Sequence, residues 1–323
     1  MSSPRNQIIH LIQQGFIKPD QVDEALAVSE LRPSSNNWHA FIDRVLLLLG
    51  GLSLAFALMF FVAYNWSDIG KFAKFALVQI AIVIAIGCYW KLGVDKLSAK
   101  VSLLVGSILI GVLLALYGQT YQTGADPWQL FFSWALLILP WALLGRFSAI
   151  WFVWLLLVNL SLVLYHQTIS SSLWFLFDAE TGLLWLLFSF NTTALVVWEL
   201  SSKHCQWLSA RWAVRILATV SGTTISWLVI LAIFESSRNG FSSILVWLAW
   251  MPLFYFSYRK LRADLFMLAG MCLSGILIIV SLLAYAIINS FEAGGFLLIA
   301  IALIGLGSGA TIWLKGIHRE WQS

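Results

Sequence analysis

Ten long apolar segments determine what this chain can fold into. A helix needs roughly 20 apolar residues to cross a bilayer core about 30 Å thick. The ten segments approach that length and are continuously apolar, without the two-residue alternation of barrel strands. The sequence therefore predicts an all-α, polytopic membrane helix bundle with about ten transmembrane helices, at Val45–Tyr64, Phe72–Trp90, Val101–Tyr117, Gln129–Gly145, Ala149–Tyr165, Gly182–Trp198, Trp212–Phe234, Phe241–Tyr258, Leu265–Ile288 and Gly294–Leu314.

The composition excludes a soluble protein. Of the 323 residues, 60% are hydrophobic and only 11% are charged, whereas a soluble domain has about 25% charged residues. The net charge of +4 does not indicate a nucleic-acid partner, because the basic residues lie in short loops between apolar segments and not on a soluble domain. Membrane lipids are the partners that this composition predicts.

The positions of Lys and Arg predict the orientation. With the N-terminus placed in the cytoplasm, only Lys71, Lys74 and Arg238 of the 19 basic residues lie outside. Positive residues collect in cytoplasmic loops, so we expect both termini in the cytoplasm. We expect the membrane to be the inner (cytoplasmic) membrane of a bacterium.

Three parts are expected along the chain. Residues 1–37 are a cytoplasmic helical hairpin and linker, residues 38–165 carry the first five spans, and residues 166–323 carry the last five. Gly15 is expected to end the first helix in a left-handed conformation, and Pro19 to begin the second. The polar run at 33–37 is expected to be the linker. The hairpin is either a stabilising cap or a docking module for another protein.

No catalytic or cofactor motif is present in the sequence, so we expect no enzyme and no cofactor. His166, Asp178 and Glu180 could bind a metal, but their spacing does not select for one, and we expect solvated loop residues. No ionisable residue lies near the middle of a span, which argues against a proton-coupled carrier. The amides of Gln79, Asn159 and Asn191 are expected in interhelical hydrogen bonds, with a substrate path as the alternative.

Two predicted outer loops combine amides, aromatic rings and one carboxylate. They read Tyr64-Asn65-Trp66-Ser67-Asp68 and Gly118-Gln119-Thr120-Tyr121, the latter continuing to Gly124-Ala125-Asp126-Pro127. The parity of the topology places both loops on one face. We therefore expect an outer-face recognition cluster at Asn65, Trp66, Gln119, Tyr121 and Asp126. A self-satisfied structural cluster, or interfacial anchoring by Trp and Tyr, would use the same residues.

At these residues the sequence resembles a family of bacterial predicted membrane proteins, the domain of unknown function 2157. The resemblance rests on Gly15-Phe16-Ile17, the Asn65-Trp66 pair, the Gly118-to-Pro127 pattern and the helix after it, with Trp134 and Pro140. It covers residues 8–165. It implies no activity, but its members resemble subunits encoded beside other membrane proteins, which implies a complex. Gly70 stands where many members have proline.

The last span contains Gly305 and Gly309 at GxxxG spacing. Small residues at this spacing let another helix approach closely. We therefore predict that both glycines face a close helix neighbour, inside the chain or outside it. On that basis Gly309→Leu would lower yield or thermal stability by overpacking.

Two functions are consistent with these observations. The favoured one is a non-enzymatic subunit or scaffold of a bacterial envelope membrane complex, with other membrane proteins as partners. The alternative is a transporter or flippase for a small or lipid-linked substrate. A polar cavity that reaches one face would favour the alternative.

Overall fold

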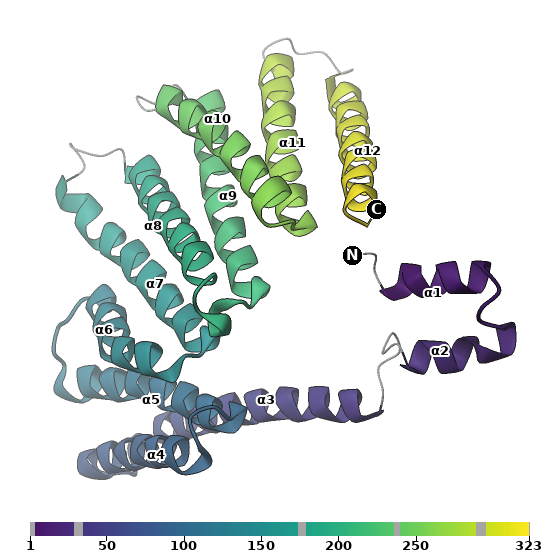
Figure 1. Cartoon of the computed structure of the whole chain (residues 1–323). Helices are drawn as coiled ribbons and strands as arrows, with labels where there is room; N and C mark the ends of the chain where they lie inside the picture. Colours follow the sequence, from purple (N-terminus) through teal and green to yellow (C-terminus); the bar gives the residue numbers. More distant parts are fainter. Residues whose placement is uncertain (1–3, 29–34, 174–178, 236–239, 289–294, 323) are drawn as a thin grey trace. The chain divides into compact units, whose positions relative to one another are not determined.

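The computed structural model describes residues 4–28, 35–173, 179–235, 240–288 and 295–322. These residues form twelve α-helices and no strand (Figure 1). The all-α fold class predicted from the sequence is confirmed. Ten of the helices, α3 to α12, are long and apolar enough to cross a membrane, which is the number predicted from the apolar segments.

Two short helices precede the spans. Helix α1 (Pro4–Gln13) is followed by a 3₁₀ turn (Pro19–Gln21) and α2 (Val22–Val28). Gly15 has a φ of +76°, and the amides of Gly15 and Phe16 donate to the carbonyls of Ile12 and Leu11 at 3.0 Å each. This is the Schellman pattern that closes a helix on a left-handed glycine, so the stop predicted at Gly15 is confirmed.

The chain divides into two compact units, residues 1–165 and 166–323. The spans of the first unit are α3 (Ser35–Tyr64), α4 (Lys71–Leu92), α5 (Leu97–Tyr121), α6 (Pro127–Gly145) and most of α7 (Ser148–Leu173). The second unit contains α8 (Ala179–Ser201), α9 (Arg211–Phe234), α10 (Gly240–Phe256), α11 (Leu265–Ile288) and α12 (Gly295–Gln322).

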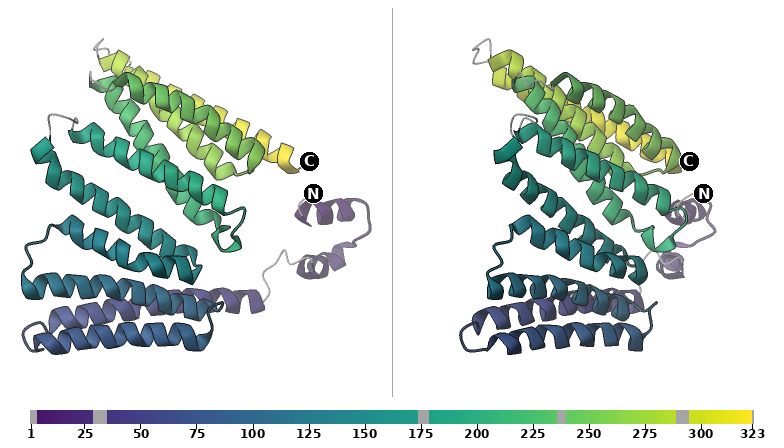
Figure 2. Two further views of the ribbon diagram at one scale, coloured as in Figure 1. Left: turned by 60° about the vertical axis from the view of Figure 1, so that its left-hand side comes forward. Right: turned by 90° about the vertical axis from the view of Figure 1, so that its left-hand side faces the viewer.

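Helix α5 is the central span of the first unit and packs against α3, α4 and α6 (Figure 2). Its most apolar window is 44% buried, against 11% for α3. Small residues allow this close packing. The indole of Trp134, from α6, lies directly over Gly111 and donates its Nε1–H to the carbonyl of Ser107 at 2.7 Å.

Helix α9 has the same role in the second unit, where it packs against α8, α10 and α11. Hydroxyl pairs join it to its neighbours. Thr192 of α8 bonds Ser221 of α9, and Ser226 of α9 bonds Ser274 of α11 at 2.6 Å. Hydrogen bonds between polar side chains on neighbouring spans therefore hold this unit together, as expected for helices packed in lipid.

Two connections between helices test predictions made from the sequence. Residues 35–37, predicted as part of a linker, instead form the first turn of α3. Ser and Asn suit a helix start, where their side chains can accept from free backbone amides. The short connection between the fourth and fifth spans is as predicted. It turns within Arg146 and Phe147, with Arg146 in the left-handed region at φ +43°.

Candidate functional site

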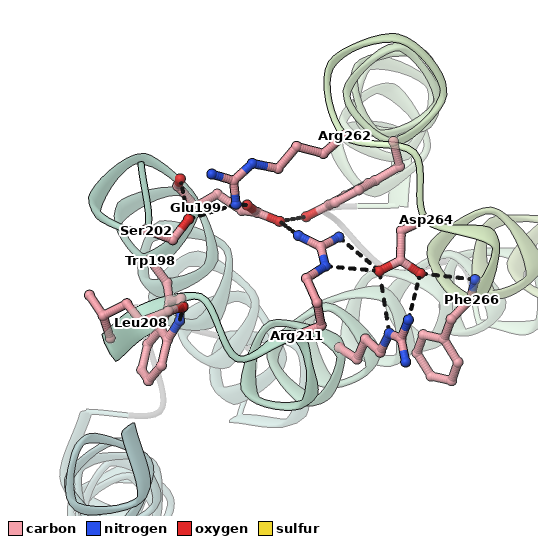
Figure 3. Close-up of polar contacts among 10 residues, drawn as sticks. Trp198, Glu199, Ser202, Leu208, Arg211, Arg262, Asp264 and Phe266 are labelled. Carbon is pink, nitrogen blue, oxygen red and sulfur yellow. Dashed lines mark hydrogen bonds and ion pairs between the residues drawn. The ribbon is translucent and has the colours of Figure 1, made fainter. Parts of the chain in front are cut away.

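An arginine–carboxylate network occupies one end of the second unit. Its members are Glu199, Arg211, Arg215, Tyr258, Arg262 and Asp264 (Figure 3). They come from the last turn of α8, the first turns of α9, the π-helical turn Ser257–Leu261 after α10, and the loop before α11. This is the end that the distribution of Lys and Arg predicts to be cytoplasmic.

Asp264 is the most buried carboxylate of the network, with a side chain only 2% exposed. Its Oδ2 accepts from Arg211 Nη2 at 2.7 Å and from Arg211 Nε at 3.1 Å. Arg215 donates from Nη2 to Oδ1 at 3.2 Å and from Nε to Oδ2 at 3.3 Å. The Phe266 amide donates to Oδ1 at 3.1 Å, so Asp264 also caps the start of α11.

Glu199 lies in the last turn of α8, where a negative charge is unfavourable to the helix dipole. Three donors compensate for that position. Arg211 Nη1 and the Tyr258 hydroxyl each lie 3.1 Å from Oε1, and Arg262 donates to Oε2. Arg262 also donates to Ser202 Oγ at 2.6 Å. The network thereby fastens α8, α9 and the start of α11 to one another.

The network carries three arginines and two carboxylates, so its formal charge is +1. Burial by itself would raise the pKa of Asp264, but hydrogen bonds from Arg211 and Arg215, and their charges, more than offset it. The pKa of the Asp264 carboxyl therefore lies below its ordinary value, and the group is ionised at neutral pH. The excess positive charge is most exposed at Arg215, whose side chain is 43% exposed.

A groove of about 350 Å³ begins beside this network and runs between α9, α10 and α11. It is lined by small residues, including Gly222 and Gly270, and by the rings of Trp227, Trp250 and Phe254. Trp227 is 53% exposed and Leu273 is 57% exposed, so the groove opens onto the outer surface of the bundle. We call it the α9–α11 groove.

Arg215 joins the network to the groove. Its guanidinium lies over the Phe266 ring, 5.4 Å from the centroid, and Phe266 lines the groove. Thr219, one helical turn after Arg215, lines the groove as well. The half-exposed guanidinium of Arg215 thus lies at one end of the mostly apolar α9–α11 groove. This arrangement suits an amphiphilic molecule with a negative head.

Sequence reasoning assigned these basic residues to topology and missed the network. Arg211 and Asp264 are 53 positions apart, and no motif marks the pair. One signal was present in the sequence: Glu199 and Asp264 are acidic residues close in the sequence to Lys203, Arg211 and Arg262. Carboxylates retained there indicate ion pairing.

The predicted outer-face cluster is only partly assembled in the structure. Asn65 donates to the Phe61 carbonyl of its own helix at 2.9 Å, and the Lys74 ammonium lies 3.7 Å from the Trp66 ring centroid. Tyr121 packs on Tyr117 and Phe75. Within the described residues no hydrogen bond joins the two loops, and Gln119 and Asp126 are exposed. A recognition role for the cluster remains a prediction.

Gly305 and Gly309 are both exposed on α12. They border the face that packs against α11, where Ala302, Leu306, Ala310 and Ile317 are half-buried or buried. A Cβ added at either glycine would meet no atom within 4 Å in the described part of the chain. Overpacking within the chain is therefore not expected at Gly309, and a close neighbour would have to come from outside it.

The structure does not describe all three residues that the sequence offered as possible metal ligands. Asp178 lies outside the described residues, and nothing is shown of the Glu180 side chain. Among the described residues there is no group of three His, Cys, Asp or Glu side chains placed to hold a metal ion. Cys88, Cys205 and Cys272 are unpaired thiols.

Comparison with known proteins supports the resemblance seen in the sequence. No curated protein and no solved structure matches the chain. Residues 10–151 match the family model described as predicted membrane protein (DUF2157). The match begins within α1 and extends through the spans α3 to α6 to the beginning of α7, including the Asn65-Trp66 and Gly118-to-Pro127 patterns. Over these residues of its N-terminal half, this multi-pass membrane protein is similar to the DUF2157 family.

Proposed function

We propose that this protein is a non-enzymatic subunit of a membrane complex, in the inner membrane of a bacterium, and that α12 is its docking helix for a partner span. The observation that carries the proposal is the exposure of α12. None of its most apolar window is buried against the described part of the chain, and a Cβ added at Gly305 or Gly309 would meet no described atom within 4 Å.

Three contacts hold α12 in place with both glycines exposed. Ile317 is 2% exposed, the ring centroids of Trp313 and Tyr255 lie 6.1 Å apart in a stacked pair, and Arg259 Nη2 bonds Glu320 Oε2 at 2.7 Å. Glycine in a helix costs about 1 kcal/mol relative to alanine. Close approach of a partner's backbone would compensate for that cost, whereas lipid tails would not.

Photo-crosslinking tests this proposal in the native membrane. A photoreactive residue at Ser308, an exposed position between Gly305 and Gly309, should give a discrete crosslinked product with another membrane protein. The same residue at Val83, on the exposed face of α4, should give lipid adducts. Adding Gly309→Leu should abolish the Ser308 product, because the leucine side chain holds the partner helix away.

Gly87→Leu provides the matched control. A Cβ at Gly87 of α4 also meets no atom within 4 Å among the described residues, so this variant should leave the Ser308 product intact. Lipid adducts alone at Ser308, or a product that survives Gly309→Leu, would contradict the proposal. A product at twice the mass of the chain would mean self-association and would contradict a mixed complex.

A second candidate, a flippase for a lipid-linked substrate, is favoured by the opening of the α9–α11 groove toward the bilayer. Its test is the transfer of a fluorescent phospholipid between leaflets of vesicles that contain the purified protein. Transfer that exceeds protein-free vesicles and disappears with Gly270→Leu would support transport. No excess transfer would eliminate it.

A further inference from the structure

We infer that the α9–α11 groove is a binding site for an anionic phospholipid, with one acyl chain between α9 and α11 and the phosphate at Arg215. This inference goes beyond assembly through α12, because it concerns lipid held by this chain alone. It also does not require that the lipid be moved between leaflets.

The shape of the groove matches a chain lying along the helices. The α9 residues that line it, Thr219, Thr223, Ser226 and Ile230, recur every three or four positions and so share one face. The α11 residues Phe266, Gly270, Leu273 and Leu277 repeat at the same interval. At 1.5 Å per residue each series extends about 16 Å along its helix, roughly half the bilayer core.

The volume of the groove is compatible with one acyl chain, since the groove holds about 350 Å³. That volume is at the lower limit for small-molecule sites, roughly 300 Å³. Ser226 and Ser274 satisfy each other at 2.6 Å, so these polar groups need nothing from the occupant.

The charge at the end of the groove selects an anionic head. Arg215 uses Nε and Nη2 on Asp264, and its Nη1 has no hydrogen-bond partner among the described residues. Asp264 is also held by Arg211, so Arg215 is not required to neutralise it alone. A guanidinium binds phosphate oxygens well, and Arg215 lies one turn inside the end of α9. In the orientation predicted from Lys and Arg, the negative cytoplasmic leaflet adds attraction.

The glycines of the groove make it possible to block the site without disturbing the fold. A Cβ at Gly270 meets no atom within 4 Å in the described part of the chain, so Gly270→Leu should fill the groove and leave the packing intact. Gly87→Leu adds the same side chain at an equally open position of α4 and serves as the control. Arg215→Gln removes the cation and leaves the apolar walls.

The experiment measures lipid adducts by native mass spectrometry, and the shift of the thermal unfolding midpoint, for the full chain in mild detergent. The probes are phosphatidylglycerol, phosphatidylcholine with the same acyl chains, and inorganic phosphate. Wild type and Gly87→Leu should bind phosphatidylglycerol about tenfold more tightly than phosphatidylcholine. Phosphate alone should give neither an adduct nor a shift. Gly270→Leu should lose both lipids, and Arg215→Gln should bind the two lipids equally.

Each alternative has its own signature. Equal binding of the two lipids by wild type, or binding that survives Gly270→Leu, would overturn the site. A shift with phosphate alone would mean a free-anion site and would overturn it too. Because Arg215→Gln is judged by the ratio of two lipids in one variant, a loss of stability does not obscure the result. None of these readouts depends on the partner at α12, so the two proposals fail separately.

Discussion

At the scale of single residues, Asp264 shows how one buried carboxylate can organise several elements. It caps α11 through the Phe266 amide and holds Arg211 and Arg215 of α9. Its side chain is 2% exposed, so removing its charge would leave two guanidinium groups without their main acceptor. An exposed ion pair would be worth little, but this one also satisfies the start of a helix.

We expect Asp264→Asn to lower the thermal unfolding midpoint in detergent at pH 7, through a loss of about 1–3 kcal/mol. Because asparagine can still cap a helix, the loss of stability measures the contribution of the ion pairs to Arg211 and Arg215. Asp126→Asn is the matched control, because Asp126 is the residue before α6 and makes no side-chain cap hydrogen bond. An unchanged midpoint in Asp264→Asn would show that the network contributes no stability.

Wild type and Asp264→Asn should also differ in how their thermal unfolding midpoints respond to pH. The pKa of Asp264 is lowered in the folded state, so its contribution is complete above the ordinary carboxyl pKa of about 4. That contribution is lost as the pH falls further, toward the folded-state pKa. The difference in midpoint between wild type and Asp264→Asn should therefore be constant near neutrality and shrink below about pH 4. A difference that grew on acidification would have the wrong sign.

What the sequence could predict at this scale depended on the range of the interaction. Gly15 was found because a helix stop is a local backbone requirement. The pairing of Glu199 with Arg262, 63 positions away, depends on how three spans pack. Hydropathy and charge patterns contain no information on that packing. The arginine–carboxylate network was therefore not predicted from the sequence.

At the scale of elements, α5 and α6 show why the spans contain so much glycine. The Trp134 ring covers Gly111, and the Trp141 ring covers Gly106, where a Cβ would lie 2.8 Å from Cζ3. Large rings on α6 thus fit against positions on α5 that have no side chain. Helices in lipid gain association energy from such close packing and not from the hydrophobic effect.

We therefore expect Gly111→Ala and Gly87→Ala to change stability in opposite directions. A methyl group at Gly111 would collide with the fused indole of Trp134, which cannot move as a flexible chain end would, and overpacking of this kind costs about 1–3 kcal/mol. At Gly87 the added methyl meets open space and gains up to about 1 kcal/mol of helix propensity. Midpoints that moved together would contradict the packing of α5 on α6.

The sequence predicted the number of spans but not the residues at which the helices end. Ten spans follow from the length of apolar segments, because the bilayer core sets that length. The helices are longer than the apolar segments, as in α12, which continues from Leu314 to Gln322. Polar last turns remain helical where ion pairs such as Arg259 with Glu320 hold them, and hydropathy does not detect such turns.

At the scale of the whole molecule, the two units share one construction. Each has a central span whose most apolar window is 44% buried, α5 in the first and α9 in the second. Both central spans are rich in Gly, Ser and other small residues, whereas the peripheral spans carry the exposed Leu, Ile and Phe side chains. The family match stops at residue 151, so the groove and the network lie in the half of the chain beyond it.

The orientation of the whole bundle gives the last prediction. Three spans, α6, α7 and α8, separate the loop at Thr123 from the loop at His204, so the two loops must lie on opposite faces if all three cross. Both residues are exposed. In a variant without Cys88, Cys205 and Cys272, Thr123→Cys should react with a membrane-impermeant maleimide in intact cells. His204→Cys should react only after permeabilisation, because positive loops stay in the cytoplasm.

Reaction at both positions in intact cells would mean that an even number of these helices cross. Protection of Thr123→Cys together with labelling of His204→Cys would invert the bundle, and would place Arg215 and its groove in the outer leaflet.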